Sequence, residues 1–146
     1  MIKLYDLLVL IHVFAIISWL GAMYFNLTLI FPMYKSHQGT TYAELMQEQG
    51  TRAAPLLYAL IILTVVSGIW LANIAGQQLV SYWMLGKLGC LLLMVACHLY
   101  GSFVLWPRVF LALPQERDNL FYIYKLSMLV SATAGSIAVV LTYLGK

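Results

Sequence analysis

Long apolar runs separated by short polar stretches make up this chain. Four runs reach the length of about 20 residues that a helix needs to cross a hydrocarbon core about 30 Å thick. In hydrocarbon every backbone polar group must be bonded within the protein, and a helix does this within one segment. The pattern therefore predicts an all-α integral membrane protein, a four-transmembrane-helix bundle with up-down topology. The predicted helices of this single membrane domain cover about residues 7–31, 53–74, 79–106 and 120–144.

Polar residues mark three connections between these runs. The first, at 32–52, is long enough for a short surface helix around Tyr42–Gln49. The second is a tight turn at 76–78, and the third, at 107–119, contains two prolines. Trp and Tyr prefer the two membrane–water interfaces. Residues of these types near the predicted helix ends are Tyr5, Tyr34, Tyr82, Trp83, Trp106, Tyr122 and Tyr143.

The composition agrees with this class. Of the 146 residues, 63% are hydrophobic and 9% are charged, whereas soluble domains carry about 25% charged residues. Eight basic against five acidic residues give a net charge of +3, too little for a nucleic-acid-binding face. Two cysteines do not make a disulfide framework. We therefore expect a lipid bilayer as the main partner and no nucleic acid.

Lys and Arg predict the orientation, since positive loops stay in the cytoplasm. The side with both termini and the 76–78 turn has Lys3 and Lys146. The other side has more, namely Lys35, Arg52, Arg108, Arg117 and Lys125. We expect loops 32–52 and 107–119 in the cytoplasm and the termini in the periplasm, in a bacterial inner membrane. The first run is longer than the core of a signal peptide, so we expect it to be retained.

Three ionisable residues lie inside the predicted helices, where each costs about 2.5–3.5 kcal/mol to insert. They are His12, Lys87 and His98. At about 1.5 Å per residue, His12 and Lys87 come within roughly 5 Å of one level, and His98 lies roughly 15–20 Å further in. The two axial ligands of one haem must share a level. The depths therefore predict that His12 and His98 do not bind the same iron.

Helical spacing places these residues on stripes. One stripe of the first helix holds His12, Trp19 and Asn26, and one stripe of the third holds Lys87 and His98. We expect an outer cluster of His12 with Lys87 and an inner cluster around His98. The polar neighbours expected from the inner half are Tyr24, Asn26, Tyr58, Tyr122 and Tyr124.

Simpler explanations remain open for all of these residues. A His or Asn inside a membrane is often an interhelical hydrogen bond worth about 0.6 kcal/mol, and Lys87 has a long stem that can reach the interface. Cys90, Met94 and Cys97 beside His98 are soft donors that suit Cu(I), and they are also ordinary apolar filling. The small residues at four-residue spacing, which predict close helix packing, are Ser127, Ser131 and Gly135.

Two stretches carry a family resemblance. The first reads His12-Val-Phe-Ala-Ile-Ile-Ser-Trp19-Leu-Gly21-Ala-Met-Tyr24, and the second reads Tyr82-Trp83-Met-Leu-Gly-Lys87-Leu88, followed by His98. Together they resemble the superfamily of HemJ-type protoporphyrinogen oxidases and the CopD copper-resistance domain. The chain lacks two elements of the HemJ type. One is an Arg and a His at the end of the first helix, and the other is an Arg-x-x-Asn-Glu element before the last helix. It therefore resembles a divergent member.

The resemblance implies haem b as the cofactor. It implies metal-ligating roles for His12 and His98, with His12 favoured, and a functional role for Lys87, which would bind a porphyrin propionate or a substrate carboxylate. Trp19, Tyr24 and Asn26 would then line the cofactor site. It also implies a redox activity, an oxidoreductase acting on a porphyrin substrate, and it leaves room for a homo-oligomer.

Two other functions stay open on the sequence. One is copper handling, with copper as the cofactor in place of haem, through Met94, Cys97 and His98, with Met23 of the first helix as a further donor. The other is a cofactor-free membrane subunit or assembly factor. Light absorption by bound haem and metal analysis would separate the three.

Overall fold

The computed structural model describes residues 4–36, 40–74 and 81–144. Within these ranges, four helical stretches are long and apolar enough to cross a membrane: Leu4–Met33, Ala43–Ile74, Tyr82–Leu111 and Gln115–Leu144. The four helices predicted from the hydropathy pattern are therefore confirmed. The expected turn at 76–78 lies outside the described residues.

Each of the first three long helices is interrupted by one π turn. The first is made of α1 (Leu4–Phe25), a π turn at Asn26–Ile30, and α2 (Phe31–Ser36). The second is made of α3 (Thr40–Glu48), a π turn at Gln49–Ala53, and α4 (Ala54–Ile74). The third is made of α5 (Tyr82–Tyr100), a π turn at Gly101–Leu105, and α6 (Trp106–Leu111), and the fourth is the single helix α7 (Pro114–Leu144).

The helix ends differ from the predicted ones where polar residues form helix. The expected surface helix near Tyr42–Gln49 is α3, and it runs on into α4 instead of standing apart. The third helix passes Pro107, which lies in the first turn of α6 directly after the π turn, so one helical hydrogen bond is missing there. Helix α7 begins at Pro114, well before Leu120, because its polar first residues are compatible with helix although they are not apolar.

The helices pack as two pairs, α1 along α4 and α5 along α7. Between α5 and α7 the Oγ of Ser127 donates to the Cys97 carbonyl at 3.0 Å, and the Oγ of Ser131 donates to the Met94 carbonyl at 2.9 Å. A Cβ at Gly135 would lie 2.8 Å from the Met94 sulfur. The close packing predicted from small residues is thus confirmed.

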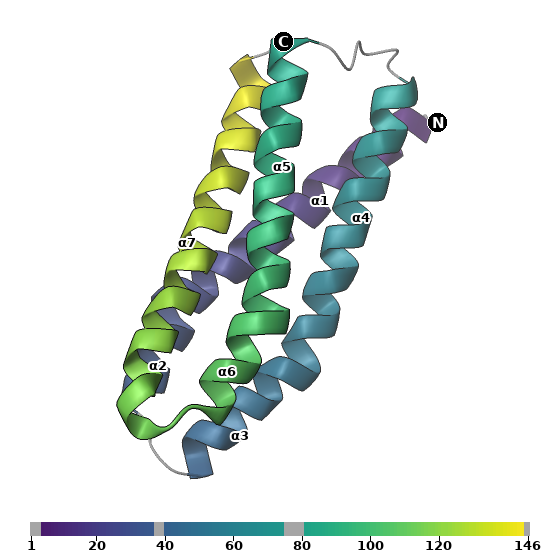
Figure 1. The fold of residues 1–146 in the computed structure, drawn as a ribbon. Coiled ribbons are helices and arrows are strands. Elements are labelled where there is room, and N and C mark those ends of the chain that lie inside the picture. Colours follow the sequence, from purple (N-terminus) through teal and green to yellow (C-terminus); the bar gives the residue numbers. More distant parts are fainter. Residues whose placement is uncertain (1–3, 37–39, 75–80, 145–146) are drawn as a thin grey trace.

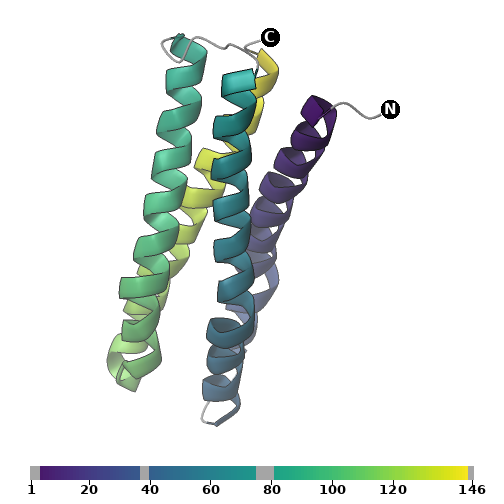
Figure 2. The ribbon, with the colours of Figure 1, turned by 90° about the vertical axis from the view of Figure 1, so that its right-hand side faces the viewer.

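Figures 1 and 2 show where the elements meet. The start of α1, the end of α4, the start of α5 and the end of α7 lie at one end of the bundle, and α2, α3 and α6 lie at the other. All three π turns are therefore in the half that carries the long polar connections.

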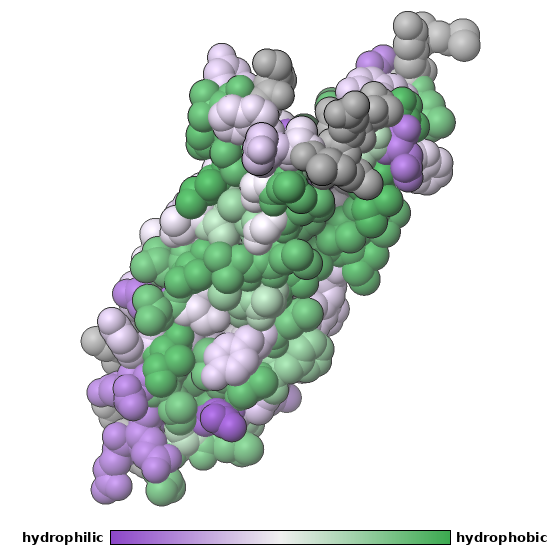
Figure 3. Space-filling view, turned by 45° about the horizontal axis from the view of Figure 1, so that its top comes forward, coloured by the Kyte–Doolittle hydropathy of each residue, from purple (hydrophilic) through white to green (hydrophobic). Residues whose placement is uncertain are grey.

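The flank of the bundle is apolar. In Figure 3 hydrophobic residues cover most of the visible side, and hydrophilic residues gather mainly near the two ends. Only 22–28% of the residues in the apolar window of each long helix are buried within the chain. Most of the hydrophobic surface therefore faces outward, which suits a lipid environment and not water.

Two clusters of buried side chains fill the interior. One lies in the middle of the bundle and includes Trp19, Met23, Leu57, Leu60 and Met94. The other lies near α2, α3 and α6 and includes Phe31, Met46, Leu105, Val109, Tyr124 and Met128. His98 is buried beside the first cluster, one helical turn after Met94 on α5.

Candidate functional site

His98 is the most unusual polar residue of the described chain. Its side chain is 2% exposed, and neither Nδ1 nor Nε2 has a hydrogen-bond partner among the described residues. A neutral imidazole carries one donor and one acceptor, and leaving such groups buried without partners costs about 1–3 kcal/mol. A buried ring of this kind is therefore a candidate to bind something that is not part of the chain.

Aromatic rings surround this imidazole. The ring of Trp19 meets His98 edge-on with centroids 5.9 Å apart, and the ring of Tyr58 does so at 6.1 Å. Tyr58 in turn stacks on Phe103, with centroids 5.7 Å apart and planes 8° from parallel. Through these contacts α1, α4 and α5 meet at His98, between the two helix pairs.

Trp19 is a second unsatisfied group at the same place. Its side chain is fully buried, and its indole Nε1 has no hydrogen-bond partner within the described residues. The site therefore offers an N–H donor on α1 beside an imidazole on α5, enclosed by aromatic surface.

Interhelical bonds hold the helical turn that carries His98. The carbonyls of Met94 and Cys97, which precede it, accept the hydroxyls of Ser131 and Ser127 on α7. These bonds fix the α5 backbone against α7 on one side, while the imidazole points toward α1 and α4. The backbone of the site is therefore braced, although the ring nitrogens are not.

His12 has the opposite surroundings. Its Nδ1 lies 2.9 Å from the Oγ of Ser67 on α4. That hydroxyl donates its only proton to the Leu63 carbonyl, so it accepts the Nδ1 proton of His12. The bond assigns the tautomer with a proton on Nδ1 and a lone pair on Nε2. A Cβ at Gly68 would lie 3.1 Å from the His12 Cε1 atom, so glycine lets the ring lie close to α4.

The expected outer cluster does not form. Lys87 is half-buried and makes no hydrogen bond or ion pair within the part of the chain that the structure describes, while His12 bonds to α4 instead of facing Lys87. The reason is the pairing of the helices: α1 packs mainly along α4, and α5 packs mainly along α7.

The inner cluster forms with different members. Trp19 and Tyr58 join His98, as expected for Tyr58. Tyr24 instead bonds to the Oγ of Ser136 at 2.8 Å, and the Oδ1 of Asn26 accepts from the Nε2 of Gln49 at 2.9 Å. Tyr122 is exposed, and Tyr124 packs into the second core cluster.

The depth offset between the two histidines is smaller than the sequence predicts. Trp19 contacts His98 and lies two helical turns after His12, about 10 Å along α1. Tyr58 and Ser67, the α4 neighbours of the two imidazoles, are about 13 Å apart along α4. The expected 15–20 Å is therefore an overestimate, yet the two rings still lie at separate levels.

The soft donors on α5 are not gathered into one site. The described residues contain no group of three His, Cys, Asp or Glu side chains placed to hold a metal ion. Cys90 and Cys97 are free thiols and half-buried, and the Met94 sulfur lies against Gly135.

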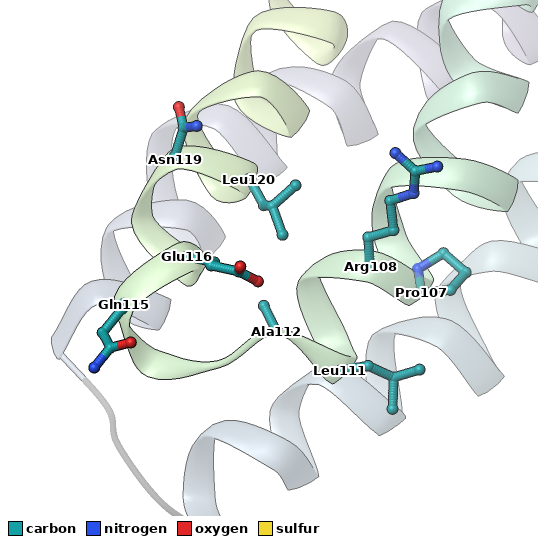
Figure 4. Close-up of a pocket in the computed structure, with 8 residues that line it drawn as sticks. All are labelled: Pro107, Arg108, Leu111, Ala112, Gln115, Glu116, Asn119 and Leu120. Carbon is teal, nitrogen blue, oxygen red and sulfur yellow. The ribbon is translucent and has the colours of Figure 1, made fainter.

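Two pockets lie near the loop end of the bundle. One, of about 710 Å³, is formed where α6 meets α7 and includes Arg108, Glu116 and Asn119; Figure 4 shows Glu116 directed into it from the first turn of α7. The other, of about 370 Å³, lies between the first two long helices and is mostly apolar. Asn26 and Gln49 line this second pocket about halfway along it.

Comparison with known proteins gives no match to a family model, a curated protein or a solved structure.

The sequence analysis missed four contact residues of these sites. They are Ser67 and Gly68 at His12, Phe103, which stacks on Tyr58 at the His98 site, and Gln49 at Asn26. The adjacent small pair Ser67-Gly68 within an apolar run is the one local signal that could have indicated a close approach. The other two depend on π turns, which hydropathy does not reveal.

Proposed function

We propose that the chain is an integral membrane protein of four spans that binds haem b, with His98 as the axial ligand. The observation that supports this most is the His98 imidazole, which is buried and lacks a hydrogen-bond partner for either nitrogen among the described residues. Such a group destabilises the protein unless a partner from outside the described chain pairs with it.

The residues at His98 suit this group. The imidazole supplies an axial nitrogen donor, the commonest protein ligand of haem iron. The rings of Trp19, Tyr58 and Phe103 supply aromatic surface, and the Trp19 Nε1 supplies a hydrogen-bond donor. Binding requires Tyr58 to turn away, since its ring lies between α4 and His98. When bound, haem supplies one-electron chemistry, and the apolar surroundings exclude water from it.

We assign the ligand role to His98 rather than to His12. The Ser67 bond already compensates part of the cost of burying His12, although its Nε2 stays free, whereas both nitrogens of His98 lack a partner among the described residues. Lys87 lies about three helical turns from His98 on α5, about 16 Å, so it is too far to meet a propionate of haem bound there. We propose that it binds a substrate carboxylate at the other end of the bundle, in an oxidoreductase acting on a porphyrin.

The test is haem retention. We expect purified protein, reconstituted with haem in detergent, to show a Soret band that His98→Ala abolishes and His12→Ala keeps. Circular dichroism checks that both variants are folded. Absence of a Soret band from the unaltered protein would contradict the proposal, and stoichiometric copper in that sample would favour the copper function instead.

Orientation is part of the same proposal. We place the loops at 32–52 and 107–119 in the cytoplasm of a bacterial inner membrane, because five Lys or Arg lie on that side and two on the other. A C-terminal alkaline phosphatase fusion, active only in the periplasm, should be active. Activity only from a fusion inserted in loop 107–119 would reverse the orientation.

A further inference from the structure

The apolar pocket between the first two long helices has one polar pair about halfway along it. Its volume is about 370 Å³. Asn26 and Gln49 are this pair; Ile30, Met33 and Leu45 line the pocket toward the loop end, and Leu56, Leu57 and Leu60 line it toward the middle of the bundle. A ligand that fits has one small polar head at Asn26, apolar substituents beside it and an apolar tail along α4.

The polar pair comes from two π turns. Asn26 begins one and Gln49 begins the other, and their amides are bonded across the helices at 2.9 Å. Single π turns inside α-helices are frequent at functional sites. The bond uses the Asn26 carbonyl oxygen, so the Asn26 amide nitrogen still has donors to offer a ligand.

The charge around the pocket selects the kind of head. Glu48 is the one charged residue among those that line it, and its carboxylate pairs with Arg52 at 2.7 Å. A phosphate or a fatty-acid carboxylate would meet an acid here and no lining cation. The head is therefore neutral and accepts hydrogen bonds.

The pocket adjoins the His98 site through single residues. Ser18 lines the pocket, and the next residue, Trp19, contacts His98. Leu57 lines it as well, and the next residue, Tyr58, contacts His98 from α4. Adjacent residues of α1 and of α4 thus face the pocket on one side and the His98 imidazole on the other.

We propose that this pocket binds a membrane quinone, with a ring carbonyl accepting from the Asn26 amide and the isoprenoid tail along Leu56, Leu57 and Leu60. A quinone is neutral, accepts hydrogen bonds at its carbonyls and dissolves in the bilayer. The choice of a quinone over another neutral amphiphile rests on the proposed haem function, because a quinone is the lipid-soluble carrier that exchanges electrons with a membrane haem.

The experiment measures binding of a benzoquinone with a ten-carbon tail by calorimetry in detergent. It is done on the unaltered protein and on His98→Ala, so that haem is not needed for the result. We expect saturable binding to both. Asn26→Leu and Asn26→Asp should each weaken binding about tenfold, the effect of losing about 1.4 kcal/mol. Asn119→Leu, which changes an exposed amide in the other pocket, should not change it.

The outcomes separate the two proposals. Quinone binding without a Soret band in reconstituted protein would keep this site and remove the haem. A Soret band without saturable quinone binding would overturn this inference alone. If Asn26→Leu and Asn26→Asp bound the quinone as tightly as the unaltered protein does, the inference would be overturned too. Equally strong competition by a neutral alcohol with the same tail would also overturn it, because the pocket would then bind any acyl chain without selecting the head.

Discussion

His12 and His98 are the same residue type in two apolar helices, yet their surroundings are opposite. His12 packs on Gly68 and bonds to Ser67, whose own proton goes to the Leu63 carbonyl. His98 is more deeply buried and has rings on two sides but no hydrogen-bond partner in the described chain. His12 therefore makes an ordinary interhelical hydrogen bond, whereas His98 makes none within the described chain.

The difference shows why residue type alone misleads inside a membrane. Both histidines cost free energy to insert, and the sequence therefore marks both. Only the packing shows which histidine has a hydrogen bond that compensates for its cost of insertion. At His12 the compensation comes from two small residues on α4, and at His98 it must come from outside the described chain or be absent.

The largest expected effect tests the packing at His12. Gly68→Val would place a Cβ 3.1 Å from the His12 Cε1 atom, so the ring must shift away from α4, which strains its bond to Ser67. We expect a loss of about 1–3 kcal/mol in the free energy of unfolding, measured by denaturant titration in detergent. Gly21→Val is the matched control, because nothing lies within 4 Å of its Cβ. Equal losses in both variants would mean that the His12 contact is not the cause.

Smaller effects are expected from replacing the two histidines, and the two effects have opposite signs. In haem-free protein, His98→Leu removes unsatisfied polar atoms from a buried apolar site and should stabilise by about 1 kcal/mol. His12→Leu removes a made hydrogen bond and should destabilise by about 0.6 kcal/mol. The same unfolding titration gives both values. Destabilisation by His98→Leu would show that its ring is satisfied in the apoprotein, which removes the main support for a ligand site there.

Much of the fold could be predicted from hydropathy because the bilayer sets the length of each apolar run. The helix ends could not be predicted in this way, and the errors in their positions explain the error in the depth offset between His12 and His98. α1 begins at Leu4, earlier than the predicted start at residue 7, which puts His12 further from its end. The third helix runs to Leu111, past the predicted end at 106, which puts His98 further from the other end. Both shifts bring the two histidines closer in depth than 15–20 Å.

The members of the site were harder to predict. Tyr58 was expected near His98 from its depth, and it does contact the ring. Trp19 was expected on the His12 stripe, and its contact with His98 was not foreseen. Asn26 was placed by continuing the same 3.6-residue stripe, but a π turn begins at that residue and changes the phase. Helix pairing decides the rest: Lys87 could face His12 only if α5 lay along α1, and the interhelical serine bonds instead hold α5 to α7.

The smallest expected effect concerns how the His98 turn is held. Ser131 is fully buried, and its hydroxyl donates to the Met94 carbonyl at 2.9 Å. Ser131→Ala should destabilise by about 0.6 kcal/mol, the usual value of an interhelical hydrogen bond in a membrane. The loss is small because that carbonyl keeps its bond within the helix. Thr133→Ala is the control, since the exposed Thr133 bonds only within its own helix, to the Leu129 carbonyl. A comparable loss in Thr133→Ala would assign the effect to α7 itself. A selective loss in Ser131→Ala would show that the interhelical bond holds the α5 turn before His98, so this turn is fixed without any bond to the ring nitrogens.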